Sequence, residues 1–525
     1  MSARNRNTSV MPDTGRPIGT GWNWSLLARP RAALNALAAR LFAPVDNSSI
    51  VFFRIAFGLI MLWEVERYLS YGWVASEYID PQYFFPYVGF EWVKPWPGIG
   101  MYLHFYALAA LAVCIAVGFA YRISMTLFFL GITYVFLLDK AHYLNHMYLV
   151  CLLSFLMIFI PANRDLSIDA MRRPSIRSRT VPTWALVLLA AQVAIVYIYG
   201  GIAKLNGDWL RGEPMRTWLA DESDLPIVGS WVREEWFVYF VSDAGLLLDL
   251  FIIPFLLLPK TRWLAVIALI IFHRFNATMF SIGIFPMFAT AAIVLLLPPD
   301  LPRRVATYVG SMFSTRYGRT TRPWRGERVA ETPDNERSIV PFTQRPLVQR
   351  ATVGLVVAYL AIQLLLPLRH YLYPGNTAWT DQQDRFSWRM MLHSKVGEMA
   401  FEVTDPRTGE TWLVEPQTYL TSFQAGNMQS QPDMMLQFSH FLADEWQRNG
   451  YDNVEVRAQT MISLNARDRY PIVDPAVDLA AESLSIGNAD WITSLSEQER
   501  LATAQSGQDG APSDQQEEEE QQLQG

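Results

Sequence analysis

Long apolar stretches separated by polar connections dominate the first 370 residues of the chain. A helix rises about 1.5 Å per residue, so that roughly twenty apolar residues cross the hydrocarbon core of a bilayer. Several stretches are shorter than this, and their boundaries are correspondingly less sharp. We predict nine transmembrane helices, at residues 48–69, 101–120, 123–138, 143–160, 184–203, 245–258, 263–280, 282–297 and 351–367.

The pattern changes after residue 370. Short segments rich in β-formers, at Met399–Val403, Thr411–Val414 and Asn453–Ser463, alternate with turn-forming residues, and an amphipathic helix is predicted at Pro432–Asn449. The predicted fold is therefore an α-helical polytopic membrane protein with a small C-terminal β-rich extracytoplasmic domain.

The distribution of arginine gives the orientation. The N-terminal arm, the connection after the fourth stretch and residues 298–350 are rich in arginine, with ten in the last of these, whereas the connection at 205–244 is acidic. The positive-inside rule places basic connections in the cytoplasm. Nine helices satisfy every assignment, with the N-terminus cytoplasmic and the C-terminal domain outside.

These patterns divide the chain into six parts. We expect a cytoplasmic Arg-rich arm (1–47), a domain of eight transmembrane helices (48–297), a cytoplasmic basic connection (298–350), a ninth transmembrane helix (351–369), the β-rich domain (370–485) and a largely disordered Gln/Glu-rich tail (486–525). No cleavable signal peptide is visible, so the first helix is expected to act as the targeting signal.

Composition supports a membrane protein and excludes several other classes. Hydrophobic residues make up 51% of the 525 residues, and the net charge is only −6. The two cysteines, Cys114 and Cys151, both lie in apolar stretches, so neither a disulfide framework nor a zinc site is expected. No nucleophile elbow, phosphate-binding loop or metal-ligand spacing is present, and membrane orientation accounts for the basic segments without nucleic acid.

Five polar residues lie where hydrocarbon is expected. Lys204 ends an uncharged run that begins at Thr183, and His273 lies about 18 Å into the seventh helix at 1.5 Å per residue. Ionisable groups at such depth usually mark a site or a pathway, although helix–helix hydrogen bonding is the alternative. We expect Arg54, His104 and His142 to be structural. The residues predicted to share a site in the outer half of the membrane are Asn145, His146, Lys204, His273 and Asn276.

Several of these residues stand in a recognisable sequence context. The chain resembles the vitamin K-dependent γ-glutamyl carboxylases over about residues 48–480. The resemblance rests on Leu138-Asp139-Lys140, Asn145-His146, Gly201-Ile202-Ala203-Lys204-Leu205, Asp208-Trp209, Gly245-Leu246-Leu247-Leu248-Asp249-Leu250, Phe272-His273 with Asn276, Ser387-Trp388-Arg389-Met390-Met391 and Arg407-Thr408-Gly409-Glu410.

The resemblance implies a membrane enzyme that couples two reactions. A lysine deprotonates reduced vitamin K, which reacts with dioxygen; the resulting alkoxide removes the γ-proton of a protein glutamate, carbon dioxide adds, and the 2,3-epoxide leaves. The catalytic lysine falls on Lys204, with His146 as a second catalytic residue. Ordinary lysine and phenol pKa values are both about 10, so that proton transfer between them costs little. Residues expected to bind the cofactor are Asn145, His273, Asn276, Trp388 and Met391.

The implied reactants are reduced vitamin K or menaquinol, with dioxygen and carbon dioxide as co-substrates and no metal. The implied partners are the bilayer and a glutamate-containing secreted protein. The chain departs from the family at Gln383-Asp384, where a Leu-Tyr pair is usual, and it lacks cysteines for the family's interdomain disulfide. We interpret it as a bacterial-type homologue, in a bacterial cell membrane, with a shortened C-terminus.

These departures leave three alternatives open. The first is a quinol epoxidase without protein carboxylation. The second is a transporter or lipid-handling protein on the same scaffold, and the third is a structural membrane partner. Because of the departures, quinol oxygenation is better supported than carboxylation. The presence of Lys204 and both histidines argues against the transporter.

Overall fold

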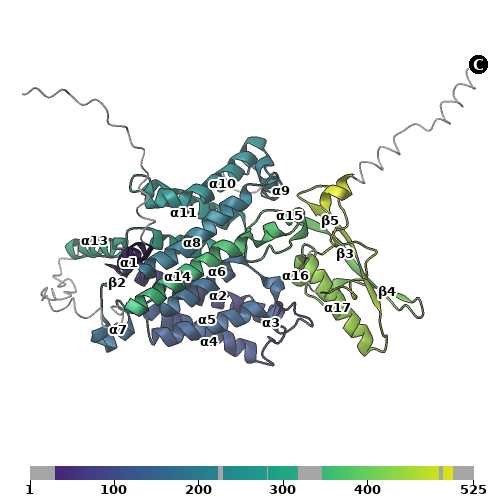
Figure 1. The fold of residues 1–525 in the computed structure, drawn as a ribbon, viewed down its shortest axis with the longest axis horizontal. Helices are drawn as coiled ribbons and strands as arrows, with labels where there is room; N and C mark the ends of the chain where they lie inside the picture. Colours follow the sequence, from purple (N-terminus) through teal and green to yellow (C-terminus); the bar gives the residue numbers. More distant parts are fainter. Residues whose placement is uncertain are drawn as a thin grey trace, which may run out of the picture.

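The computed structural model describes residues 30–220, 222, 229–280, 282–316, 346–483, 487 and 489–500. Figure 1 shows a bundle of helices followed by a smaller domain that contains the sheet. Much of the predicted N-terminal arm (1–29), most of the basic connection (317–345) and most of the predicted tail (501–525) lie outside the described residues.

A helix is present at each of the nine expected positions. Within the described residues, six segments are long and apolar enough to cross a membrane, or seven if the pair Phe285–Leu296 and Leu301–Met312, bent by 100°, forms one span. A count of nine transmembrane helices therefore remains a prediction. The nine helices are α2 (Ser48–Ser70), α4 (Gly100–Val117), α5 (Tyr121–Leu138), α6 (Asn145–Phe159), α8 (Thr183–Lys204), α10 (Glu235–Leu257), α11 (Arg262–Met279), α12 (Phe285–Ala292) and α14 (Pro346–Leu365).

One boundary differs clearly from the sequence prediction. Helix α10 begins at Glu235 rather than at residue 245. Its first turns carry Glu235 and Asp243, which the sequence assigned to the acidic connection, and Asp243 is exposed. The helix continues beyond the apolar stretch because its buried face, including Phe237 and Val238, packs in a satellite core with Trp209. Hydropathy indicates which part of a helix is apolar enough to lie in the membrane, but it does not show where the helix begins or ends.

Shorter elements complete the bundle. They are α1 (Pro30–Leu41), α3 (Trp73–Tyr78), the 3-10 turn η2 (Lys140–His142), α7 (Ile168–Arg172), η4 (Trp209–Arg211), α9 (Met215–Ala220), η5 (Ile293–Leu296) and α13 (Leu301–Arg316), with strands β1 (Pro44–Asp46) and β2 (Thr180–Pro182) paired antiparallel.

Two of the three residues expected to be structural have that role. Arg54 is fully buried, and its guanidinium donates hydrogen bonds to the carbonyls of Ala116, Ala162, Asp165 and Leu166. His104 hydrogen-bonds the carbonyl of Gly131 at 3.1 Å, which joins α4 to α5. Buried backbone carbonyls need such partners, and Arg54 supplies them where the chain leaves helical structure.

The C-terminal domain is built around a three-stranded antiparallel sheet of order β4-β3-β5. Strands β3 (Lys395–Thr404), β4 (Thr411–Val414) and β5 (Glu455–Leu464) confirm the three predicted strands. Helix α17 (Pro432–Arg448) confirms the predicted amphipathic helix and packs Phe438 against Phe401 at 5.0 Å between ring centroids. Helix α16 (Ser422–Met428) precedes it and faces the bundle.

Ion pairs and hydrogen bonds join the domain to the bundle. Asp139 accepts a hydrogen bond from Gln424 at 2.7 Å, and Lys140 pairs with Asp433 at 2.5 Å. Burial lowers the pKa of Lys140 to about 8, although the Asp433 carboxylate opposes this shift. A second contact lies beyond the end of α8, where Asp208 pairs with Arg467 at 2.6 Å. The motif residues Asp139, Lys140 and Asp208 therefore fasten two domains together.

Candidate active site

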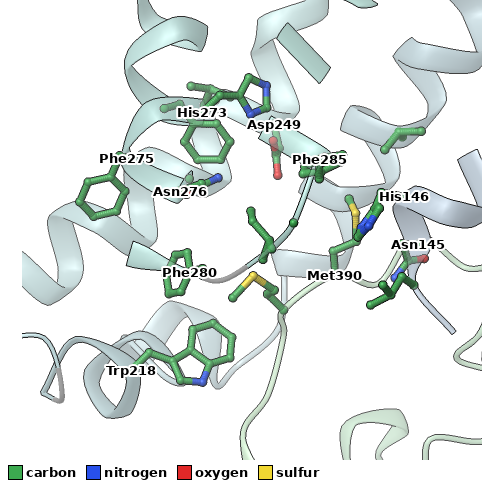
Figure 2. A pocket seen from close by; sticks show the side chains of 18 of the residues that line it. Asn145, His146, Trp218, Asp249, His273, Phe275, Asn276, Phe280, Phe285 and Met390 are labelled. Carbon is green, nitrogen blue, oxygen red and sulfur yellow. The ribbon is translucent and has the colours of Figure 1, made fainter. Parts of the chain in front are cut away.

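A cavity of about 1100 Å³ lies in the half of the bundle nearest the C-terminal domain. Its walls come from α2, α6, α8, α10 and α11 and from the segment at Met390 and Met391. In Figure 2, Asn276 and His146 face the space from opposite sides, with Trp218 and Phe280 below. The walls are mainly apolar, with a small number of polar side chains among the lining residues.

The structure brings most of the predicted site residues together. All five residues expected at one depth line the cavity: Asn145, His146, Lys204, His273 and Asn276. Met391, predicted from the resemblance, lines it as well.

Trp388 is the exception, because it does not line the cavity. It is fully buried outside the set of residues that line the cavity, and its ring stacks on Tyr148 at 5.0 Å. The backbone is left-handed at Trp388 (φ 57°) and again at Met391 (φ 50°). These turns direct Met390 and Met391 to the cavity and place Trp388 in the core, which residue spacing could not show.

Lys204 forms a buried ion pair with Asp249. Its Nζ lies 2.7 Å from Oδ2 of Asp249 and 3.3 Å from the carbonyl oxygen of Gly200, and it lies over the ring of Trp209 at 5.1 Å. Lys204 and Asp249 are only 7% and 6% exposed. The sequence argument treated Lys204 as a lone amine, whereas the structure pairs it with a carboxylate from α10. A charge inside the predicted stretch 245–258 was the available signal for Asp249.

Two glycines of α8 allow this pair to form. A Cβ on Gly201 would lie 2.8 Å from the backbone nitrogen of Leu250, and one on Gly200 would lie 3.4 Å from Oδ2 of Asp249. Real Cβ atoms do not approach a backbone nitrogen this closely, so only glycine at position 201 permits the observed distance between the helices. The close contact of α8 with α10 puts Lys204 within reach of Asp249.

The two histidines lie on either side of one aromatic ring. His273 hydrogen-bonds the hydroxyl of Tyr197 through Nε2 at 2.8 Å, and its Nδ1 has no hydrogen-bond partner among the described residues. The ring of Phe285 lies 5.9 Å from His273 and 6.1 Å from His146. The hydrogen bond to Tyr197 sets the orientation of the His273 ring, and Nδ1 is buried without a partner in the described part of the chain.

Asn145 holds the wall of the cavity in place. Its Oδ1 accepts a hydrogen bond from Tyr143 at 3.0 Å, and its Nδ2 donates to the carbonyl of Arg389 at 3.4 Å. Tyr143 in turn accepts a hydrogen bond from the backbone of Phe386 at 2.7 Å. These bonds tie α6 to the segment that carries Met390.

A second group of polar residues lines the cavity beside η2 and α3. It contains Glu64 and Arg67 of α2, Glu77 of α3 and His142 of η2. Sequence reasoning did not find this group, and it expected His142 to be structural. Burial lowers the pKa of His142, but the carboxylates of Asp139 and Glu77, at 3.5 and 3.6 Å, outweigh it and raise the value.

The cavity offers no metal site. Among the residues that the structure describes, no three His, Cys, Asp or Glu side chains are grouped so that they could hold an ion.

The fold and this cavity define a class: a multi-pass helical membrane protein with a buried lysine–aspartate pair in an apolar cavity and a small sheet-containing domain beside the bundle. Comparison with protein families agrees. Residues 42–301 match the HTTM domain, and residues 348–498 match the lumenal domain of the vitamin K-dependent gamma-carboxylase. No solved structure matches the chain. The chain belongs to the vitamin K-dependent gamma-carboxylase family.

The ion pair gives a first prediction. Asp249→Leu leaves the Lys204 ammonium buried without a partner, and we expect a loss of about 3–5 kcal/mol of stability. Combining it with Lys204→Met removes both charges and restores most of that loss. Thermal unfolding in detergent measures both variants, and a double variant no more stable than Asp249→Leu would contradict the pairing.

The helix contact gives a second prediction. Gly201→Ala forces α8 and α10 apart, and we expect about 1–3 kcal/mol of destabilisation. Gly207→Ala is the matched control, because a Cβ there would meet no atom closer than 3.9 Å. Equal melting temperatures for the two variants would show that the close approach is not required.

Proposed function

We propose that the cavity oxygenates reduced vitamin K or menaquinol and that the protein is a vitamin K-dependent γ-glutamyl carboxylase with coupled epoxidase activity. The observation that carries this proposal is the buried pair of Lys204 and Asp249 in an apolar cavity that also receives His146 and His273. Family membership supports reduced vitamin K as the cofactor.

The cavity suits a lipid-soluble reactant. Phe240 of α10 and Ile271 of α11 line it, yet they are 61% and 63% exposed. Side chains so exposed belong to the outer apolar surface as well, so the cavity reaches that surface between the two helices. A quinol dissolved in the bilayer can enter there without crossing water.

The polar groups suit the two oxygens of a quinol. His273 has an unpaired Nδ1, and Asn276 lies one turn away on the same face of α11. His146 faces them from α6. We assign His146, His273 and Asn276 to the quinol oxygens and Met391 to the apolar wall. Asn145 positions that wall, because both ends of its amide already have partners.

Lys204 acts as the base through its carboxylate partner. One proton can lie on Nζ of Lys204 or on Oδ2 of Asp249, 2.7 Å away, and the amine is free when the proton lies on the carboxylate. The amine then takes a quinol hydroxyl proton, and the resulting ammonium lies beside the protonated Asp249, so that the deprotonated quinol oxygen would balance its charge. Oxygenation of the bound quinol to the 2,3-epoxide would supply the strong base that removes the glutamyl γ-proton before carbon dioxide adds.

The departure at Gln383-Asp384 lies away from this chemistry. Gln383 accepts a hydrogen bond from Arg369 at 2.8 Å, and Asp384 pairs with Arg389 at 2.7 Å. Neither residue is among those that line the cavity. The missing Leu-Tyr pair therefore does not remove a cavity wall in this chain.

We further propose that the C-terminal domain is extracytoplasmic, as the lumenal-domain match suggests, and that the N-terminus is cytoplasmic in a bacterial cell membrane. The implied partners are then the bilayer, the quinol and a secreted glutamate-containing protein. The alternative is quinol epoxidation without protein carboxylation. An assay that measures epoxide and fixed carbon separately distinguishes it from this proposal.

Replacing Lys204 with alanine tests the proposal. Purified protein is supplied with reduced vitamin K, dioxygen, labelled bicarbonate and a glutamate peptide, and epoxide and fixed carbon are scored separately. Lys204→Ala should lower both products by about a hundredfold or more, because the general base is lost. Lys260→Ala, an exposed lysine outside the cavity, is the control.

The outcomes are distinct. Wild-type epoxide without fixed carbon would select the epoxidase alternative, and neither product would favour a transporter or lipid-handling protein. Full epoxide formation by Lys204→Ala would refute the assignment of the base.

A further inference from the structure

Arg67 of α2 is held in place at the wall of the cavity. Its Nη1 donates to Glu64 at 2.6 Å, and its guanidinium lies 5.3 Å from the ring of Trp63 and 5.1 Å from that of Trp73. The side chain is 16% exposed and lines the cavity. Three contacts therefore fix a planar cation at a cavity wall, which is more than an arginine at a helix end needs to reach the membrane interface.

The Arg67 guanidinium has more N–H donors than its hydrogen bond to Glu64 uses. An arginine carries five N–H groups, and the hydrogen bond to Glu64 is the one recorded for Arg67 in the described part of the chain. The other amino group lies on the same planar fork, which matches the two oxygens of a carboxylate. Glu64 thus orients the fork and leaves donors available.

His146 points at the same space. Gly283 has a left-handed backbone (φ 60°), and a Cβ built on it would lie 3.4 Å from Nη1 of Arg67, 3.9 Å from Nη2 and 3.9 Å from Nε2 of His146. Gly283 therefore lacks the side chain that would contact Arg67 and His146. An acceptor beside Gly283 can reach the guanidinium, with the imidazole next to it.

The surroundings favour a ligand that comes from water. This end of the cavity includes Phe423 of α16, which is 50% exposed at the junction with the C-terminal domain. The apolar opening between α10 and α11 belongs to the other end. A peptide that reaches the junction between the domains can extend one side chain past Phe423 toward Arg67.

We propose that Arg67, beside His146, binds the side-chain carboxylate of a glutamyl residue of the substrate, and that Gly283 keeps the space for it. This inference rests on the proposed function only in taking a glutamyl residue as the substrate. Arg67 is then the residue that distinguishes glutamate from its neutral isostere glutamine, and Glu64 is the residue that positions it.

A binding measurement without quinol tests this assignment. Wild-type protein in detergent should bind a glutamate peptide about tenfold to a hundredfold more tightly than the same peptide with glutamine, as expected for a charge-assisted hydrogen bond. Arg67→Gln should abolish that preference, and Arg67→Lys should keep part of it. The matched control is Arg448→Gln, which breaks an Arg–Glu pair of the same i,i+3 spacing on the exposed face of α17.

Each result either supports or contradicts the assignment of Arg67 to the glutamyl carboxylate. An unchanged preference for the glutamate peptide in Arg67→Gln would overturn the proposal, as would displacement of that peptide by bicarbonate, which would assign the fork to the smaller anion. If Arg67→Gln unfolds, the weaker preference of a folded Arg67→Lys variant still tests it. Because quinol is absent, failure of the wild type to form epoxide would count against the proposed function and not against this site.

Discussion

The ion pair between Lys204 and Asp249 is the constraint on which the arrangement of the cavity depends. Neither charge is stable alone among apolar helices, so α8 and α10 must meet where the two residues lie. Glycine at positions 200 and 201 makes that approach possible. The pair is neutral as a whole, so that an apolar cavity can hold it. One contact thus accounts both for the packing of two helices and for the presence of two ionisable groups in the cavity wall.

The family motifs separate into two physical roles. Lys204, His146 and His273 line the cavity, whereas Asp139, Lys140 and Asp208 bind the C-terminal domain through Gln424, Asp433 and Arg467. The second set still matters for chemistry. By fixing the domain on the bundle, it holds the left-handed segment that presents Met390 and Met391 to the cavity. A motif residue can therefore be essential without touching a reactant.

The cavity has two ends of different character. One end opens among aromatic and aliphatic side chains of α10 and α11, and the other carries Arg67, Glu64, Glu77 and His142 beside the extramembrane domain. Such an arrangement suits the proposed reaction of a lipid-soluble quinol and a water-soluble peptide, because each reactant is poorly soluble where the other is dissolved. His146 lies between the ends, near Phe285 on one side and Arg67 on the other.

The amino-acid sequence by itself determined where helices and strands form. Apolar runs and β-forming segments act locally, so a helix or strand lies at each predicted position, although α10 begins ten residues earlier than hydropathy placed it. Depth along a helix is equally local, and Lys204, His146 and His273, predicted to share a depth, line one cavity. The direction in which a side chain points from its helix, and the contacts between distant segments, are not determined locally. Asp249 as the partner of Lys204, Trp388 in the core and Arg67 beside His146 follow from packing between helices, which only the tertiary structure decides.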